Sequence, residues 1–195
     1  MEDWLYQVGA MVNHAAIQLD RQAFARAQAS AVECVARARA IHHRALTGFA
    51  YNLLAQTQLA LDKLGAAQES CTQALASWQT LESSPYRLQT HACLAEIARR
   101  QNDFARAQNE CAAIFEFLYA HPNRQGAPSA LAALLACYQV ARARHDANAS
   151  ALLDKAYAQL QARAEKISDA ALRQCFLENV PTNAEITRLW RAQSS

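Results

Sequence analysis

Phe24-Ala25-Arg26-Ala27-Gln28 recurs unchanged as Phe104-Ala105-Arg106-Ala107-Gln108, and Leu64-Gly65-Ala66-Ala67-Gln68 has the same pattern midway between them. Each copy places a large apolar residue before two spacers, an alanine and a glutamine. Cys71 and Cys111 follow the second and third copies at the same offset. A fixed period of about 40 residues is typical of helical repeat arrays, in which each unit buries its apolar face against its neighbours. Such arrays present a long surface and seldom carry out chemistry.

The composition of the 195 residues also favours helices. Only four glycines and four prolines are available for turns, and alanine, the best helix former, is frequent. Although 52% of the residues are hydrophobic, no run approaches the roughly 18 to 20 apolar residues that a membrane span requires. The start, Met1-Glu2-Asp3-Trp4, lacks the basic segment of a signal peptide. We therefore expect an all-α protein with no membrane association.

Charge and cysteine content bear on partners and location. The net charge is +2, with 16 Arg and 3 Lys, which is too small to attract nucleic acid or membranes strongly. Six cysteines contain no C-x-x-C pair and stand where small apolar residues pack in helices: Cys34, Cys71, Cys93, Cys111, Cys137 and Cys175. We expect free, mostly buried thiols and a cytoplasmic location, because disulfides are rare in that reducing compartment.

Apolar and small residues at gaps of three and four predict helices arranged in pairs. The first helices of the pairs are predicted at Asp3–Leu19, Arg44–Leu61, Ser84–Arg100 and Ala127–Ala143, and the second helices at Gln22–Ile41, Leu64–Leu81, Phe104–Ala120 and Ala147–Ala164. Ser84 is expected to cap its helix, with Pro85 in the first turn. Asp62, Asp103 and Asp146 are expected in the turns within the pairs, where a carboxylate favours the positive end of the next helix.

These features together resemble the tetratricopeptide repeat: a small residue late in the first helix, a short acidic or glycine turn, a large residue, then alanine and another small residue. The resemblance covers four units, near 8–47, 48–87, 88–129 and 130–166. It implies a right-handed α-solenoid of about four helix pairs. The sequence departs from the family in its period, which is about 40 where the family has roughly 34 residues. The fourth copy is degenerate, since Ala149, Leu153 and Ala156 fit only with a shifted turn.

The tail, residues 167–195, breaks the repeat and is expected to form a helical cap. Ser168 is predicted to cap a helix over Ala170–Leu177, and Thr182-x-x-Glu185 reads as a capping box. The run from Arg173 to Pro181 resembles the end of tetratricopeptide regions in large bacterial signalling ATPases and transcriptional regulators, where the repeats are the sensor arm. The sequence has no G-x-x-x-x-G-K-[ST] motif and so no ATPase site of its own. Apolar residues of the tail are expected to seal the last repeat: Phe176, Leu177, Ile186, Leu189 and Trp190.

No group of residues indicates catalysis, a metal site or a cofactor. The six histidines show no H-E-x-x-H spacing, and His91 and Cys93 point away from one another on a helix. A nucleophilic cysteine would need a base and an accessible pocket, whereas Cys71 and Cys111 stand at packing positions. The basic residues Arg37 and Arg39 suit the negative end of a helix. We therefore predict a non-enzymatic protein.

In the tetratricopeptide family the first helices line a concave groove that binds a protein or peptide, and the resemblance assigns these residues to that groove: Phe49, Asn52, Gln56, Leu59, Gln89, Glu96, Arg99, Arg100, Leu134, Tyr138 and Arg142. Asn52 and Gln56 lie one turn apart, and their amides are expected to grip a peptide backbone. Arg99, Arg100 and Arg142 are expected to bind a carboxylate. The expected function is that of a scaffold or sensor arm in a bacterial regulatory protein.

Two alternatives stay open. The opening helix carries Trp4, Leu5 and Tyr6 with no preceding repeat to cover them, which indicates either a preceding domain or a homodimer. The Arg-rich stretches would suit a nucleic-acid-associated regulatory module, for which a steep loss of affinity with salt is the expected sign.

Overall fold

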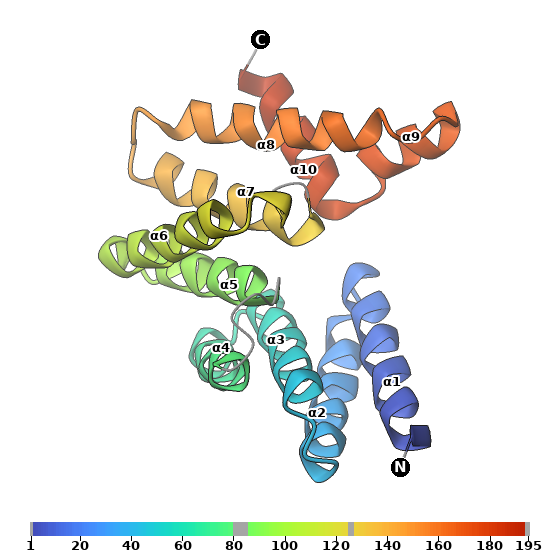
Figure 1. The fold of residues 1–195 in the computed structure, drawn as a ribbon. Helices are drawn as coiled ribbons and strands as arrows, with labels where there is room; N and C mark the ends of the chain where they lie inside the picture. Colours follow the sequence, from blue (N-terminus) through green and yellow to red (C-terminus); the bar gives the residue numbers. More distant parts are fainter. Residues whose placement is uncertain (1, 80–85, 125–126, 194–195) are drawn as a thin grey trace.

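In the computed structural model the described residues are 2–79, 86–124 and 127–193, with side chains from Tyr6 onward and without that of Arg124. These residues form helices and no strand (Figure 1). The elements are α1 (Glu2–Asp20), α2 (Phe24–Ala40), α3 (Arg44–Ala60), α4 (Leu64–Trp78), α5 (Tyr86–Arg100), α6 (Phe104–Ala120), a 3-10 turn η1 (Pro122–Arg124), α7 (Pro128–Ala143), α8 (Ala149–Ala164), α9 (Ala170–Glu178) and α10 (Pro181–Gln193). The all-α prediction is confirmed.

The repeated sequence motif opens every second helix of the first three hairpins. Phe24, Leu64 and Phe104 are the first residues of α2, α4 and α6. The motif alanines Ala27, Ala67 and Ala107, three residues further on, are fully buried. A buried alanine lets two helix backbones approach closely, and for this reason the motif requires a small residue there.

Hydrogen bonds follow the same period as the motif. Within the first hairpin the Ser30 hydroxyl donates to Gln18 Oε1 at 2.9 Å, and within the second Ser70 donates to Gln58 Oε1 at 2.7 Å. Between hairpins the motif glutamines accept from cations of the following unit. Gln28 Oε1 accepts from Lys63 at 2.9 Å, and Gln68 Oε1 accepts from Arg106 at 2.8 Å. The sequence period is therefore also a structural period.

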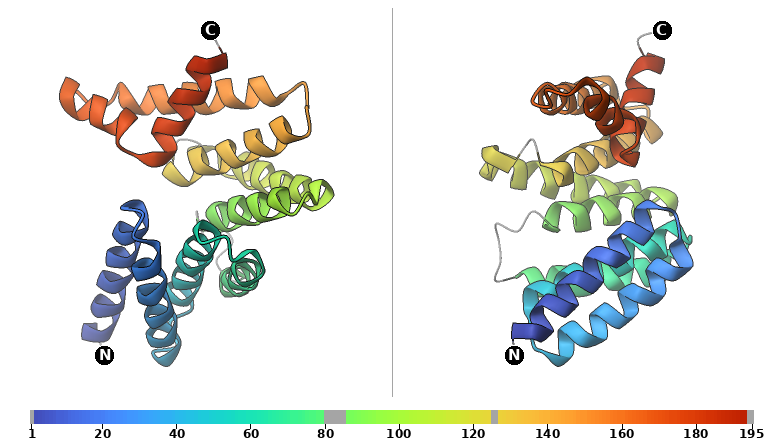
Figure 2. Two further views of the ribbon diagram at one scale, coloured as in Figure 1. Left: turned by 180° about the vertical axis from the view of Figure 1, so that it is seen from behind. Right: turned by 90° about the vertical axis from the view of Figure 1, so that its right-hand side faces the viewer.

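Consecutive helices pack against one another as hairpins, and the odd-numbered helices also contact each other, α1 with α3, α3 with α5, and α5 with α7. Figure 2 shows the hairpins succeeding one another from the amino-terminal to the carboxy-terminal end of the molecule. Helix α10 contacts both α7 and α8, as the first helix of a further hairpin would, while α9 continues the chain beyond α8. The chain thus ends with a helix in the position of the next odd-numbered one.

Five helix ends use the same turn, and none of them has glycine in it. Residues with left-handed φ follow the helices at Gln22 (59°), His42 (53°), Asp62 (57°), Asn102 (58°) and His145 (55°). At each, two backbone N–H groups bond back to the last helical turn. His42 N donates to Arg39 O at 3.0 Å and His43 N donates to Ala38 O at 3.2 Å. This pairing of bonds is the Schellman motif, in which glycine is the usual left-handed residue.

The predicted helix boundaries differ from the structure where these turns and caps intervene. The helix predicted from Gln22 begins at Phe24, because Gln22 itself adopts the left-handed turn conformation. The helix predicted from Ala147 begins at Ala149, after Asp146 Oδ1 has accepted a bond from Asn148 N at 2.9 Å. Asp103 caps α6 as expected, accepting from Arg106 N at 3.1 Å. The predicted Ser84 cap lies outside the described residues.

Two predictions about caps in the tail are wrong. The cap of α9 is Asp169, whose carboxylate accepts from Leu172 N at 2.8 Å, and not Ser168. Thr182 lies inside α10, which begins at Pro181, so Thr182 and Glu185 do not form a capping box; Glu185 pairs with Arg188 at 2.7 Å. Asp169 directly follows Ser168, and its charged carboxylate is a stronger hydrogen-bond acceptor for the N–H groups at the start of α9. Asp169 is therefore favoured over Ser168 as the cap.

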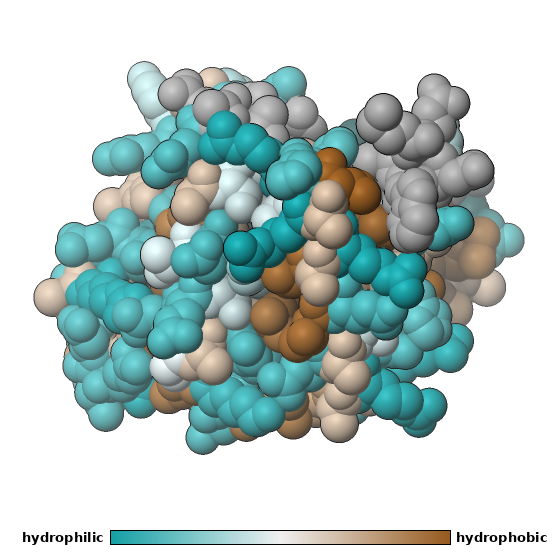
Figure 3. All heavy atoms as spheres, turned by 90° about the horizontal axis from the view of Figure 1, so that it is seen from below, coloured by the Kyte–Doolittle hydropathy of each residue, from teal (hydrophilic) through white to brown (hydrophobic). Residues whose placement is uncertain are grey.

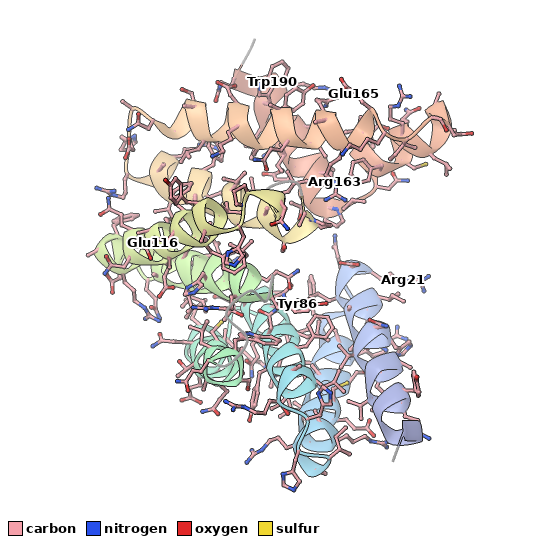
Figure 4. All side chains as sticks on the ribbon, viewed as in Figure 1. Arg21, Tyr86, Glu116, Arg163, Glu165 and Trp190 are labelled. Carbon is pink, nitrogen blue, oxygen red and sulfur yellow. The ribbon has the colours of Figure 1, made fainter. Side chains whose placement is uncertain are left out.

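Helix α10 covers the last hairpin with apolar and aromatic contacts. Ile186 is fully buried and belongs to the apolar cluster that extends from α5 to α10. Trp190 stacks on Tyr157 of α8 at a centroid distance of 4.0 Å, and its indole N–H donates to Asp154 Oδ1 at 3.0 Å. Figure 4 shows Trp190 beside α8 at the carboxy-terminal end of the molecule. Of the other tail residues expected to seal the last repeat, Leu189 is buried in the same apolar cluster, and Phe176 and Leu177 are partly buried against it.

Apolar side chains form three clusters along the array. The first joins α1, α2 and α3, the second is small and lies between α3, α4 and α5, and the third and largest extends from α5 to α10. Helix α3 packs tightly against α4 at Gly48, where a Cβ atom would lie 2.9 Å from ring atoms of the buried Trp78. Among the described residues no helix is both long and apolar enough to cross a membrane.

Candidate functional site

Helices α1, α3, α5 and α7 border a hollow with a volume of about 670 Å³. Its lining comes from the end of α1 and the start of α2, from α3, α5 and α7, and from the start of α10: Leu19, Asp20, Gln22, Phe24, Gln56, Leu59, Ala60, Gln89, Ala92, Cys93, Arg100, Pro128, Ala132, Leu135, Ala136, Gln139, Pro181 and Thr182. Figure 1 shows the end of α1 and the start of α10 near one another. Of the described tail residues, Pro181 and Thr182 at the start of α10 line the hollow, so the described part of the tail borders it without filling it.

The polar lining includes one glutamine from each of the three central odd-numbered helices. Gln56 comes from α3, Gln89 from α5 and Gln139 from α7. Gln89 Oε1 accepts from the Asn52 amide at 2.9 Å, which fixes its orientation. Among the described residues, Gln56 and Gln139 have no hydrogen-bond partner, so both amides keep donors and acceptors for a ligand.

Arg100 lies at the edge of the hollow within an ion-pair network. Its Nε donates to Glu96 Oε1 at 2.7 Å, and its Nη1 is 3.3 Å from Asp62 Oδ1. Arg99 also donates to Glu96, through two nitrogens at 2.7 Å. Burial raises the pKa of Glu96, but the hydrogen bonds and charges of the two guanidinium groups outweigh it and lower that pKa overall. Glu96 and Asp62 together balance the charges of the two arginines. The charged residues that line the hollow, Asp20 and Arg100, are opposite in sign, so the lining has little net charge.

The structure distributes the predicted groove residues among different environments. Gln56, Leu59, Gln89 and Arg100 line the hollow. Glu96 and Arg99 lie beside it, paired with one another, and Arg142 is exposed at the end of α7.

Asn52, Leu134, Tyr138 and Phe49 are engaged in packing instead. Asn52 and Leu134 are fully buried and Tyr138 is 7% exposed, so the predicted pairing of Asn52 with Gln56 as a peptide grip is wrong. Phe49 packs on Tyr86 at a centroid distance of 4.4 Å, and Figure 4 places Tyr86 between α5 and α3. These side chains hold adjacent odd-numbered helices together.

The lining from the two ends of the array is absent from the sequence-based prediction. Leu19, Asp20 and Gln22 belong to the first hairpin, and Pro181 and Thr182 belong to the tail. A smaller hollow of about 370 Å³ separates the two ends, between the last turn of α1 and the turn from α9 to α10. The curvature of the array brings these segments near one another, and no sequence motif reports that curvature.

The other predicted surfaces have mixed outcomes. Tyr6 on α1 is 75% exposed, whereas the side chains of Trp4 and Leu5 lie outside the described part. In Figure 3, which shows the molecule from below, hydrophobic residues gather in a small central area surrounded by hydrophilic ones.

Of the basic residues near the end of α2, Arg37 pairs with Glu33 at 2.7 Å. Across the described residues, no three His, Cys, Asp or Glu side chains stand close enough to hold one metal ion.

No protein-family model matches the sequence, and no curated protein is significantly similar to it. Among solved structures, the crystal structure of BtubC (BKLC) from P. vanneervenii is similar, with a TM-score of 0.68 and 20% sequence identity. The match covers 95% of this chain and 76% of that chain. At this identity the similarity concerns the fold, and it supports a helical, repeat-like architecture.

Proposed function

We propose that the chain is a tetratricopeptide-like right-handed solenoid whose hollow binds a segment of a partner protein. The observation that carries the proposal is the lining of the hollow by successive odd-numbered helices with unpartnered amides at Gln56 and Gln139. Amides that both donate and accept suit the backbone of an extended segment, and Leu59 and Leu135 provide apolar contact between them. In this proposal the chain is a non-enzymatic scaffold or sensor arm of a cytoplasmic bacterial regulatory protein.

The electrostatics favour a protein segment over nucleic acid. Among the described lining residues the one cation is Arg100, which is paired with Glu96 and Asp62. Nucleic-acid binding depends on unpaired cations that release counterions from phosphates. A neutral lining instead favours a segment with few charges.

The test is selection of short peptides from a random display library, followed by affinity measurements on the selected peptides with the full chain. The combined replacement Gln56→Ala and Gln139→Ala should weaken binding by about tenfold or more, since each lost hydrogen bond is worth roughly 0.5–1.5 kcal/mol. The matched control is Gln108→Ala, which removes an exposed glutamine of α6 away from the hollow. Equal affinities of the two variants would show that the hollow is not the binding site.

The alternatives have separate readouts. Sedimentation of the full chain distinguishes a monomer from a homodimer that uses the exposed face around Tyr6. Binding of an oligonucleotide with an affinity that falls steeply with salt would favour the nucleic-acid alternative over the protein-binding one.

A further inference from the structure

Two pairs of buried thiols connect neighbouring hairpins. Cys71 of α4 and Cys93 of α5 both belong to the middle apolar cluster, and α4 packs against α5. Cys111 of α6 and Cys137 of α7 both belong to the largest cluster, and α6 packs against α7. Cys71 and Cys111 occupy the same place after the repeated motif, whereas Cys93 and Cys137 do not follow the same spacing. In both pairs, a second helix of one hairpin meets the first helix of the next.

The two members of each pair differ in exposure. Cys71 is fully buried, whereas Cys93 is 5% exposed and lines the main hollow. Cys137 is 2% exposed, whereas Cys111 is 9% exposed. Each pair therefore has one member within reach of a small reagent and a second member directly behind it.

The pKa shifts agree with this division. The hydrogen bond to Cys93, together with burial, raises the pKa of Cys71 well above its ordinary value. The hydrogen bond from Cys137 lowers the pKa of Cys111 in spite of burial, and the pKa of Cys137 is raised. The deeper thiol of each pair is thus held protonated.

We propose that Cys71–Cys93 and Cys111–Cys137 are modification sites at which a small two-electron oxidant, of which hydrogen peroxide is the simplest, forms disulfides between successive hairpins. The thiolate of Cys93 attacks a peroxide oxygen and the O–O bond breaks. The products are the Cys93 sulfenic acid and hydroxide, which takes up a proton to become water. The sulfur of Cys71 then displaces the sulfenic hydroxyl, which leaves as a second water with the proton of Cys71. The two thiols lose two electrons and two protons, and the peroxide gains them.

The fold favours these pairings over others. A disulfide requires Cα atoms within about 7 Å and suitably directed Cβ atoms, and each pair lies on two helices that pack directly against one another, α4 with α5 and α6 with α7. Cys34 belongs to the first apolar cluster, apart from both pairs, and burial raises its pKa to about 11. Cys175 is exposed on α9 and reports whether the oxidant is active. The disulfide at Cys93 would fix α5 to α4 beside Gln89 and Ala92 of the hollow.

The experiment treats the folded full chain with hydrogen peroxide, alkylates remaining thiols after unfolding, and identifies disulfide-linked peptides by mass spectrometry. Two disulfides should form, a mass loss of about 4 Da, two hydrogens for each bond. The linked peptides should contain Cys71 with Cys93 and Cys111 with Cys137, and Cys34 should remain alkylated. Oxidation of Cys175 while these four thiols stay alkylated would overturn the proposal, as would random pairing.

Matched variants distinguish pairing by the fold from pairing by chance. Cys93→Ala should abolish the first disulfide and leave Cys111–Cys137 intact, so the second pair reports that the variant is folded. Cys34→Ala should leave both disulfides unchanged. Oxidation of the unfolded chain should give mixed pairings; if it gave the same two disulfides, the pairing would not depend on the fold and the proposal would be wrong. None of these readouts requires a binding partner, so the result is independent of the function proposed above.

Discussion

Both the nitrogen and the oxygen of the Asn52 side-chain amide on α3 form hydrogen bonds with side chains of α5. Its nitrogen donates to Gln89 Oε1 at 2.9 Å, and its oxygen accepts from the Thr90 hydroxyl at 3.1 Å. Asn52 and Thr90 are fully buried. A buried amide whose nitrogen and oxygen are both hydrogen-bonded fixes the relative orientation of the two helices, because any rotation of one helix against the other would leave buried polar atoms without partners. Asn52 thus sets the packing of the odd-numbered helices and, through Gln89, one side of the hollow.

Replacement Asn52→Ala is expected to lower the free energy of unfolding by about 1–3 kcal/mol, since it removes two hydrogen bonds and leaves a cavity. Urea unfolding followed by circular dichroism measures this change. Gln56→Ala, one turn further on α3 and facing the hollow, should stay within about 0.5 kcal/mol of the parent chain. Similar losses for both variants would contradict the assignment of Asn52 to packing and Gln56 to the hollow.

Replacement Gly48→Ala should destabilise the fold by roughly 1–3 kcal/mol, because the new methyl group meets Ser77 and the Trp78 ring at 2.9 Å. Gly9→Ala offers the opposite case in α1, where an added Cβ has nothing within 4 Å. There the lower chain entropy of alanine should stabilise the helix by about 0.5–1 kcal/mol. Thermal unfolding of the two variants gives the sign of each effect, and a stabilised Gly48→Ala chain would exclude the close contact of α3 with α4.

Replacement His42→Gly should stabilise the protein by about 0.5–1 kcal/mol, because φ of 53° is strained for a side chain and not for glycine. Ala36→Gly, at an exposed position within α2, should destabilise by about 1 kcal/mol. The opposite signs test the turn geometry, since both variants place the same residue at the surface. Chemical denaturation of the two chains in one buffer provides the comparison.

Stability should fall in acid partly through Glu96. Its pKa is lower in the folded chain than the ordinary value, so its contribution is fully present above the unfolded pKa of about 4.3 and is lost as pH falls through the folded pKa. The Glu96→Gln variant should therefore lose less stability than the parent chain between about pH 5 and pH 3. The free energy of unfolding is measured for both chains across this pH range. An equally steep decline of that free energy in the two chains would show that the arginine pairs of Glu96 do not persist in solution.

The helices could be predicted from the sequence because their signals are local. The motif residues Leu64 and Phe104 begin α4 and α6 as predicted, and Ala120 and Ala164 end α6 and α8. Alanine content, the spacing of apolar residues and the interruption of helices by proline each depend on residues that are close in the sequence. The predicted start of α2 was two residues too early, because Gln22 adopts the left-handed conformation in which glycine is the usual residue.

The candidate site was predicted less well because the odd-numbered helices contact neighbours on several sides. A polar residue on such a helix can face either the hollow or another helix, as Gln56 and Asn52 do. The sequence spacing of Leu134 and Tyr138 does not reveal which neighbour covers them. Likewise, the thiol pairs depend on how one hairpin meets the next, and residues 22 or 26 apart in the chain carry no pairing signal of their own.

The uneven size of the three apolar clusters has a mechanical consequence. The smallest cluster, which includes Ala55, Ala67 and Leu94, lies where α3 meets α5, between two larger ones. Interlocked apolar side chains resist bending, so this boundary, where the apolar packing is smallest, relies more than the others on the Asn52 hydrogen bonds between α3 and α5. A bend at this boundary would move Leu19 relative to Pro181 and change the width of the hollow.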